Sequence, residues 1–345
     1  MSSQETVFVT GSTGFIAQHI VIDLLKAGYK VVGTVRSASK GDELIKDLKS
    51  NGYPGENFSY EVVPDIQPEG AFDNALKAHP EVTVFLHTAS PFTFNVTDIK
   101  KELLDPAVDG TVNALKAVAA HAPGVKRVVV TSSIGAVQTW GRLERPEDTY
   151  DEDTWNRINE EQALEDTYSG YVASKKFAEK AAWEFVEKNK VNFALSVINP
   201  GVVFGPQAFP ITSAKQLNTS SQVINGILKL KPEDEVPQTT GVYIDVRDVA
   251  KAHLAAFEKE DAKGKRLLVV AGPYSDQAIL NIIREDFKTL DLALPVGDPE
   301  KGKLPKKAEK WNNERTRKIL GFEFIELEKT IHDSVQLILA DSLPN

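Results

Sequence analysis

The sequence predicts an α/β protein with a doubly wound parallel sheet and a smaller, mixed C-terminal lobe. Apolar, β-branched runs alternate with helical segments from Thr6 to Ile198, and this alternation lapses after Gly205. A glycine turn joins the first run to the first helix. Strands separated by helices pair in parallel, because each helix returns the chain across one face of the sheet. The 345 residues are enough for two lobes.

The first strand, turn and helix predict a ligand site. The run TVFVT (6–10) ends at Gly11-Ser12-Thr13-Gly14, and a helical pattern then continues to a glycine stop at Gly28. Gly11 and Gly14 permit a tight turn that brings backbone N–H groups to a pyrophosphate at the start of the helix. Ala17 stands where a small residue lets helix and strand pack closely. The pattern predicts a dinucleotide-binding Rossmann domain.

The second strand indicates which dinucleotide is bound. Residues 30–35 (KVVGTV) are followed by Arg36, with Lys40 nearby, where an NAD-binding protein usually carries an acidic residue for the ribose. A guanidinium binds a phosphate with two parallel hydrogen bonds, so the sequence favours NADP over NAD. The alternative is that Arg36 is an exposed loop residue without a ligand.

The remaining strands of the sheet place further residues near the cofactor. Helices are expected at 41–50, 71–79, 99–121 and from 167 onward, and strands at 58–63, 83–87, 126–131 and 193–198. Asp65 follows the third strand and either reaches the adenine or caps a helix. The turn Thr88-Ala89-Ser90 follows the fourth strand, at the carboxyl edge of the sheet where ligands bind. The tripeptide Asn199-Pro200-Gly201 is expected to break the last of these strands.

Tyr171 and Lys175 lie four residues apart in a predicted helix, so their side chains share one face. A lysine cation one turn away favours the tyrosinate and lowers the tyrosine pKa, which suits general acid catalysis. Two solvated residues on a helix surface are the alternative. Thr131-Ser132-Ser133 ends the fifth strand at the same edge, and one of these hydroxyls is expected to face the site unless the serines merely terminate the strand.

Composition limits the classes of function. Forty basic and 49 acidic residues give a formal charge of −9, which argues against a nucleic-acid or anionic-membrane surface. The sequence has no cysteine, and its six histidines show no metal-ligand spacing, so no metal is assigned; His87 is expected to be a packed residue at a strand end. No signal peptide or membrane-spanning run is recognised, which makes the cytoplasm the expected location.

The C-terminal part is expected to form a substrate-binding lobe. Helices are predicted at 216–230, 276–290, 314–320 and 327–339, with a strand at 265–270. We expect residues 1–200 to form the NADP-binding domain, with 243–258 returning to it. Residues 201–242 and 259–345 are expected to form the smaller lobe.

Taken together, the motifs TGSTGFIA, HTASP, TSS, YVASK, NPGVVFGP and YIDVRDVAKAH resemble those of the extended short-chain dehydrogenase/reductase family over nearly the whole chain. The segments KKFAEKAAWEF and HTASPF look like the branch that holds fungal methylglyoxal (3-methylbutanal) reductases and plant dihydroflavonol reductases. The resemblance implies an NADPH-dependent reductase of aldehydes and ketones. Tyr171 would be its general acid, Lys175 would hold the nicotinamide ribose, and Ser133 would hydrogen-bond the carbonyl oxygen. The cofactor-binding residues it implies are Gly11, Thr13, Gly14, Phe15, Ile16, Arg36, Lys40, Asp65, Ile66, Thr88, Ala89, Ser90, Tyr171, Lys175, Pro200, Gly201 and Val203.

Phe92, Phe94, Gln138 and Tyr168 are candidates to line the substrate pocket, each with ordinary packing as the alternative. Two other functions share the Tyr/Lys pair or the cofactor fold. One is a sugar-nucleotide epimerase or dehydratase, against which Arg36 argues because such enzymes generally hold NAD. The other is a non-catalytic NADP-sensing regulator, which would tend to lose the tyrosine. The expected partner is a small carbonyl substrate, and the expected assembly is a monomer or homodimer.

Overall fold

The computed structural model describes residues 5–90, 96–211, 213, 216–290 and 292–340, which fall into two compact units. The first unit comprises Met1–Asn199, Ala250–Leu268 and Asn312–Gly321. The second comprises Pro200–Val249, Val269–Trp311 and Phe322–Asn345. Each unit has its own apolar core.

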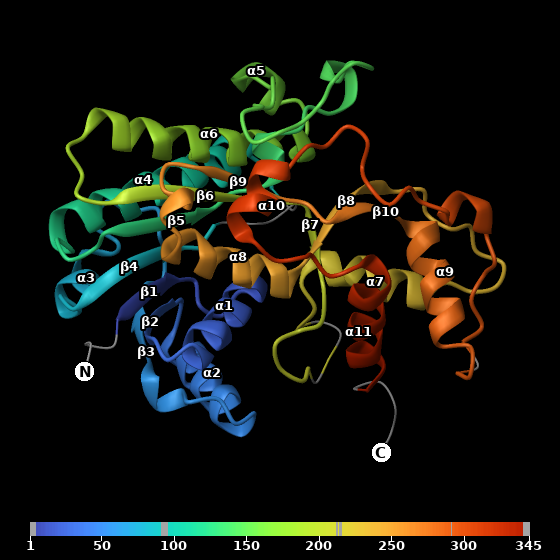
Figure 1. Ribbon diagram of the computed structural model, residues 1–345, viewed down its shortest axis with the longest axis horizontal. Coiled ribbons are helices and arrows are strands. Elements are labelled where there is room, and N and C mark those ends of the chain that lie inside the picture. Colours follow the sequence, from blue (N-terminus) through green and yellow to red (C-terminus); the bar gives the residue numbers. More distant parts are fainter. Residues whose placement is uncertain (1–4, 91–95, 212, 214–215, 291, 341–345) are drawn as a thin grey trace. The chain divides into compact units, whose positions relative to one another are not determined.

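The first unit is built on a seven-stranded parallel sheet with the strand order β3-β2-β1-β4-β5-β6-β9 (Figure 1). Its strands are β1 (Thr6–Thr10), β2 (Lys30–Val35), β3 (Phe58–Val62), β4 (Val82–His87), β5 (Arg127–Thr131), β6 (Ala194–Pro200) and β9 (Arg266–Val269). The order reverses between β1 and β4, which is the switch point at which doubly wound sheets bind their ligands. The predicted fold class is therefore confirmed.

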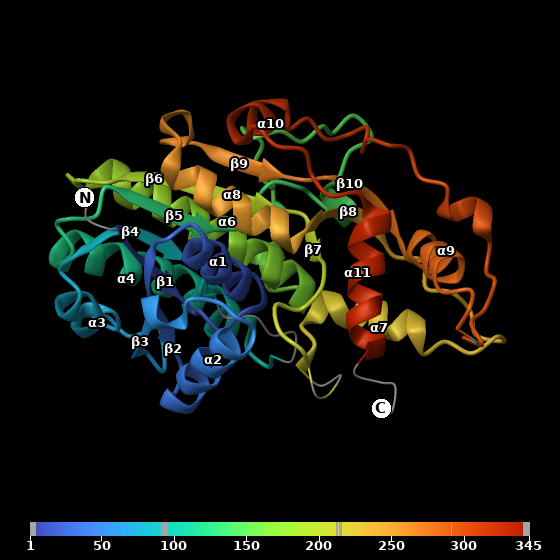
Figure 2. The ribbon, with the colours of Figure 1, turned by 60° about the horizontal axis from the view of Figure 1, so that its bottom comes forward.

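Helices cover both faces of this sheet. The helices are α1 (Phe15–Lys26), α2 (Ala38–Ser50), α3 (Asp73–Ala78), α4 (Asp105–His121), α5 (Glu160–Ala163), α6 (Thr167–Lys188), α8 (Val246–Glu258) and α10 (Glu314–Leu320). α1 and α2 lie on one face, and α4 and α6 lie side by side on the other (Figures 1 and 2). Phe8 stacks on Phe85 within the core beneath α3 and α4, with ring centroids 5.3 Å apart. Its neighbours Val7 and Val9 are also buried, as expected for a strand covered on both faces.

Two strands differ from the sequence-based expectation. β6 continues through Pro200, where a break was predicted, because a proline at the end of a strand removes no hydrogen bond that the ladder needs. β9 is the seventh strand of this sheet, although the sequence places it in the smaller lobe. A short apolar run does not reveal which sheet it joins, since the partner is set by residues far away in the chain.

The long helix predicted at 99–121 begins with a π-helical turn, η2 (Lys100–Leu104), before α4 starts. Gly170 of α6 lies against this turn. A Cβ at Gly170 would come within 2.4 Å of Ile99 Cγ2. The glycine therefore permits a close approach immediately before Tyr171.

The second unit contains a three-stranded mixed sheet with the order β10-β8-β7. Its strands are β7 (Val202–Phe204), β8 (Thr240–Asp245) and β10 (Gly272–Ser275). β7 runs parallel to β8, and β10 runs antiparallel to it. The helices α7 (Thr219–Leu228), α9 (Asp276–Asp286) and α11 (Leu327–Ala340) pack with these strands around Ile224, Ile279 and Ile331. The sequence does not predict β7 and β10 as strands, because three or four residues are too few to show a period of two.

Candidate active site

The glycine turn after β1 is held by the neighbouring strand. Gly11 N donates to Thr34 Oγ1 at 3.0 Å, and Ser12 N donates to the Thr34 carbonyl at 2.9 Å. Gly11 has φ +65°, and a Cβ there would lie 3.1 Å from Ala89. Only glycine satisfies both the backbone angle and this approach without strain.

The start of α1 fits a dinucleotide phosphate. Gly14 is its N-cap, with no side-chain cap, and the first turn contains no acidic residue. The N–H groups of this turn, which includes Phe15 and Ile16, therefore have no carboxylate competing with an anionic ligand. Thr13 lies in the glycine turn and is partly buried. These residues would hold the pyrophosphate of NADP.

The ends of β1 and β4 are joined by one hydroxyl. Thr10 Oγ1 accepts from Thr88 N at 3.1 Å and from Ala89 N at 3.0 Å, so its single proton is left for His87 Nδ1 at 3.0 Å. His87 Nδ1 is then the acceptor, and the neutral ring carries its proton on Nε2. Burial, with a smaller contribution from Lys175, lowers the pKa of His87 to about 4. His87 is thus a packed, neutral residue that orders the turn carrying Thr88, Ala89 and Ser90.

Of the predicted cofactor residues that follow β2 and β3, Arg36 and Lys40 are those expected to bind the 2′-phosphate, and they differ in their availability. Arg36 is exposed, and it has no ion pair with any residue that the structure describes. Lys40 pairs with Glu43 at 2.7 Å. Asp65 accepts from Gln67 N at 2.9 Å and so caps a turn; no helix starts there, which removes the helix-cap alternative. Ile66 packs against Gly110 of α4, where a Cβ would lie 2.7 Å from Ile66 Cδ1.

The three hydroxyls of Thr131-Ser132-Ser133 have three different partners. Thr131 Oγ1 lies 2.7 Å from His253 Nε2, and Ser132 Oγ donates to Glu179 Oε2 at 2.6 Å. Ser133 Oγ accepts from Gly135 N at 3.0 Å and also hydrogen-bonds the Tyr171 hydroxyl. Ser133 is therefore the residue of the three that the structure brings to Tyr171.

Tyr171 and Lys175 lie one turn apart on α6, with Lys175 Nζ 5.6 Å from the centroid of the tyrosine ring. Lys175 Nζ also donates to Ser90 Oγ at 2.8 Å. Burial lowers the pKa of Lys175 to about 8. Burial raises the pKa of Tyr171, and the hydrogen bond from Ser133 opposes that rise. The expectation that Lys175 lowers the tyrosine pKa is thus wrong for this structure: desolvation is the larger effect, and Ser133 supplies the opposing one.

The predicted substrate-pocket residues are only partly described. Tyr168 is 47% exposed and meets Trp140 edge-to-face, with ring centroids 5.8 Å apart. Gln138 is partly buried, two residues after the short 3-10 helix η3 (Ile134–Ala136). Phe92 and Phe94 lie outside the described residues.

Three predicted cofactor residues belong to the second unit: Pro200, Val203 of β7, and Gly201, where a Cβ would lie 2.8 Å from the Val242 carbonyl oxygen.

Sequence reasoning missed the buried polar residues behind the serines. Glu179 of α6 binds Ser132, Asn199 and Arg266, and Asn199 Nδ2 also donates to the Ser133 carbonyl at 3.2 Å. One signal was available: Glu179 follows Lys175 by four residues, so it continues the helix face of Tyr171 and Lys175. In the described residues no cluster of metal-ligating side chains occurs, and no helix is long and apolar enough to cross a bilayer.

Comparison with known proteins places the chain among reductases. GRP2 of Candida albicans, whose name proposes an NADPH-dependent methylglyoxal reductase, is 59% identical over 98% of this chain and its own full length. The NADPH-dependent methylglyoxal reductase GRE2 of Saccharomyces cerevisiae is 44% identical, over 97% of this chain and 98% of GRE2. The crystal structure of Candida albicans Gre2 with NADPH superposes with a TM-score of 0.90 and 47% identity, covering 98% of this chain and 100% of that one.

The family model described as the NAD dependent epimerase/dehydratase family matches residues 7–272. This match agrees with the Tyr171/Lys175 pair, the glycine turn and the doubly wound sheet. The chain therefore belongs to the NAD dependent epimerase/dehydratase family, that of the extended short-chain dehydrogenases/reductases.

Proposed function

We propose that the chain is an NADPH-dependent carbonyl reductase that converts small aldehydes and ketones to alcohols. The observation that carries this proposal is the Tyr171 hydroxyl, hydrogen-bonded to Ser133 and one helical turn from the Lys175 ammonium group. GRE2 is named an NADPH-dependent methylglyoxal reductase, and Candida albicans Gre2 was solved in complex with NADPH; both support the same assignment.

Tyr171 would act as the general acid. NADPH, when bound, supplies a hydride to the carbonyl carbon, and negative charge then develops on the carbonyl oxygen. Because burial raises the pKa of Tyr171, its hydroxyl keeps its proton at neutral pH and can donate it to that oxygen. A positioned acid of this kind contributes on the order of 10²–10⁴ in rate.

Ser133 and Lys175 would support this proton transfer. The Ser133 hydroxyl would donate a hydrogen bond to the developing alkoxide. The Lys175 ammonium group, fixed by Ser90, would hold the nicotinamide ribose. Arg36, which has no carboxylate partner in the described part of the chain, would bind the 2′-phosphate, with Lys40 beside it. Asp65, in the turn after β3, would reach the adenine.

Methylglyoxal is the substrate named for the relatives, so α-dicarbonyls and short aldehydes are the class that we propose here. Gln138 and Tyr168 would line the substrate side of Tyr171, together with Phe92 and Phe94. Trp140 extends this set, because its ring contacts Tyr168.

Oxidation of the nicotinamide by purified protein tests the function. NADPH and NADH are each supplied with methylglyoxal, 3-methylbutanal, a diketone and an aryl ketone. We expect oxidation that requires the carbonyl compound and prefers NADPH. If no carbonyl compound causes oxidation of NADPH or NADH, but the protein converts a nucleotide sugar, the epimerase alternative is established.

The cytoplasmic location and the monomeric or homodimeric state are further proposals that rest on the sequence. Cell fractionation tests the first. Light scattering coupled to size-exclusion chromatography tests the second, where a trimer or larger assembly would contradict it.

A further inference from the structure

A buried ion pair lies behind the proposed catalytic serine. Glu179 and Arg266 are 2.6 Å apart, and their side chains are 0% and 9% exposed. Removing two charges from water costs several kcal/mol per ion, so such a pair persists where its geometry and added hydrogen bonds repay that cost. Neither residue has an assigned role in the reaction, and both lie within the first unit.

The Glu179 carboxylate holds the serine strand end from two directions. Its Oε2 accepts from Ser132 Oγ at 2.6 Å and from Asn199 Nδ2 at 2.7 Å. The same Asn199 amide donates to the Ser133 carbonyl at 3.2 Å. The position of Ser133 is therefore fixed in two ways: the side chain of the preceding Ser132 is bound to Glu179, and the carbonyl of Ser133 itself is bound to Asn199.

The direction of the Ser133 hydroxyl depends on this backbone. Ser133 is extended (φ −163°, ψ 160°) and caps η3, where its Oγ accepts from Gly135 N at 3.0 Å. The adjacent hydroxyls of Thr131 and Ser132 are bound elsewhere. A change at Ser132 or at the Ser133 carbonyl would therefore rotate the hydroxyl that meets Tyr171.

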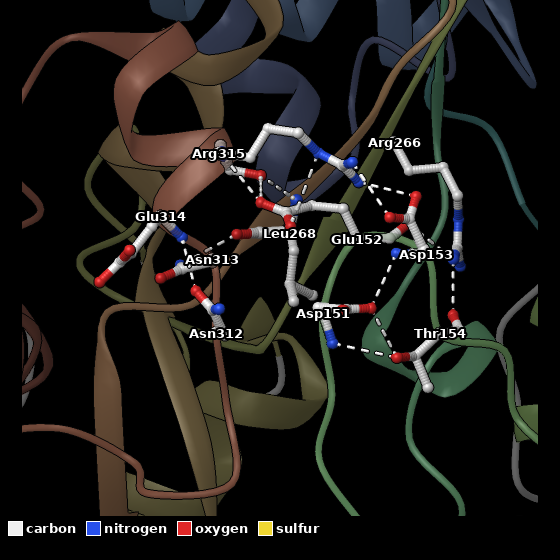
Figure 3. A network of polar contacts seen from close by, with 11 residues as sticks. Asp151, Glu152, Asp153, Thr154, Arg266, Leu268, Asn312, Asn313, Glu314 and Arg315 are labelled. Carbon is white, nitrogen blue, oxygen red and sulfur yellow. Dashed lines mark hydrogen bonds and ion pairs between the residues drawn. The ribbon is translucent and has the colours of Figure 1, made fainter.

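Arg266 holds the Glu179 carboxylate in place through the 2.6 Å contact from its Nε. Its guanidinium also donates to the carbonyls of Glu152 at 3.1 Å and Thr154 at 2.6 Å, and it lies 3.9 Å from the centroid of the Trp155 ring. Figure 3 shows Arg266 above Thr154. Polar contacts there join the segment 151–154 to the start of α10. Glu152 Oε1 accepts from Thr316 N and Thr316 Oγ1, both at 2.7 Å.

We propose that Glu179, held by Arg266, is a positioning residue that sets the direction of the Ser133 hydroxyl toward the substrate carbonyl oxygen. Glu179 acts through Ser132 and Asn199 and does not touch the substrate itself. The effect on catalysis rests on the proposed reductase function, whereas the effect on Ser133 geometry does not.

A double-mutant cycle tests the proposal. Glu179→Gln, Ser133→Ala and their combination are compared by kcat for carbonyl reduction, with NADPH affinity measured separately. We expect Glu179→Gln to lower kcat about 10- to 100-fold, because a small misplacement of a catalytic group has effects of that order. NADPH affinity should change less than about twofold. In the Ser133→Ala background Glu179→Gln should cause no further loss, since its effect passes through Ser133.

Glu152→Gln is the matched control. It changes a buried carboxylate of the same polar network whose recorded partners are Thr316 and Arg315, so kcat should stay near the wild-type value even if stability falls. Ser132→Ala is a milder variant, for use if Glu179→Gln does not fold. It keeps the ion pair, and we expect a smaller kcat loss that again disappears when Ser133 is alanine.

The ¹³Cζ chemical shift of Tyr171 gives a readout that needs no activity, because it reports hydrogen bonding at the hydroxyl. Glu179→Gln and Ser133→Ala should move this signal in the same direction, and Glu152→Gln should leave it unchanged. Equal kcat losses from Glu179→Gln in both serine backgrounds, or an unmoved signal, would overturn the positioning role. If the wild-type protein reduces no carbonyl compound while the variants still move the Tyr171 signal as expected, the proposed function is overturned and the positioning role is not.

Discussion

The Lys175 ammonium group donates a 2.8 Å hydrogen bond to the Ser90 hydroxyl, across 85 positions of sequence. This contact joins α6 to the turn that follows β4, so it links the residue proposed to hold the ribose with the edge of the sheet. The hydrogen bond also gives the Lys175 cation an acceptor within the protein interior, where burial lowers the pKa of Lys175.

Ser90→Ala should change the pH dependence of the enzyme. The pKa of Lys175 is about 8, so charge on Lys175 is lost as the pH rises through that value, and kcat/KM for NADPH should fall there. Loss of the Ser90 acceptor disfavours the charged form of Lys175, so the fall in kcat/KM should begin at a lower pH in the variant. Steady-state rates between pH 6 and pH 10, with the exposed Ser50→Ala as control, measure the shift; a fall that begins at the same pH would contradict it.

Arg36→Ala should reduce the preference for NADPH. A charge-assisted hydrogen bond contributes about 1.5–3 kcal/mol, so the ratio of kcat/KM for NADPH over NADH should fall roughly 10- to 100-fold. Lys40→Ala is the matched control and should have a smaller effect, because Lys40 already pairs with Glu43. An unchanged ratio in Arg36→Ala would refute the phosphate assignment.

Gly170→Ala should destabilise the protein. The added methyl group would meet Ile99 Cγ2 at 2.4 Å, and overpacking of this kind costs about 1–3 kcal/mol. Gly226 of α7 is exposed and has open space around its Cα, so Gly226→Ala should be neutral or stabilising by up to about 1 kcal/mol. Thermal unfolding of both variants checks the contrast, and equal midpoints would count against the close packing at Gly170.

His87 should contribute to acid sensitivity. Its folded pKa of about 4 lies below the ordinary 6.5, so the stability from its neutral form is complete above pH 6.5 and is lost as the pH falls toward 4. This loss amounts to about 3 kcal/mol. His87→Asn keeps an acceptor for Thr10 without a titrating group. Urea unfolding at pH 7 and pH 4 should show a smaller pH-dependent loss for the variant, and identical losses would contradict this role.

The sheet and the Tyr171/Lys175 pair follow from local sequence patterns. The β-branched runs, the glycine turn at Gly11 and the four-residue spacing each report on structure within a few residues. For the same reason the sequence predicts the α4 and α6 region well, apart from the π-helical turn at Lys100–Leu104.

What the sequence could not predict depends on contacts between distant segments. Glu179 meets Arg266 across 87 positions, and Glu152 meets Thr316 across 164, so neither pairing leaves a local pattern. The pKa of Tyr171 was expected to fall because of Lys175. The structure reverses this, because burial, which the helix spacing does not show, raises the pKa of Tyr171, and the hydrogen bond with Ser133 opposes that rise only in part.

The most direct test of the central claim is carbonyl-dependent oxidation of NADPH by the wild-type protein and by Tyr171→Phe, with NADPH affinity measured in parallel. If Tyr171 is the proton donor, kcat should fall about 10²–10⁴-fold, while NADPH binding should stay within about twofold. Tyr171→Phe that turns over methylglyoxal at the wild-type rate would contradict the account.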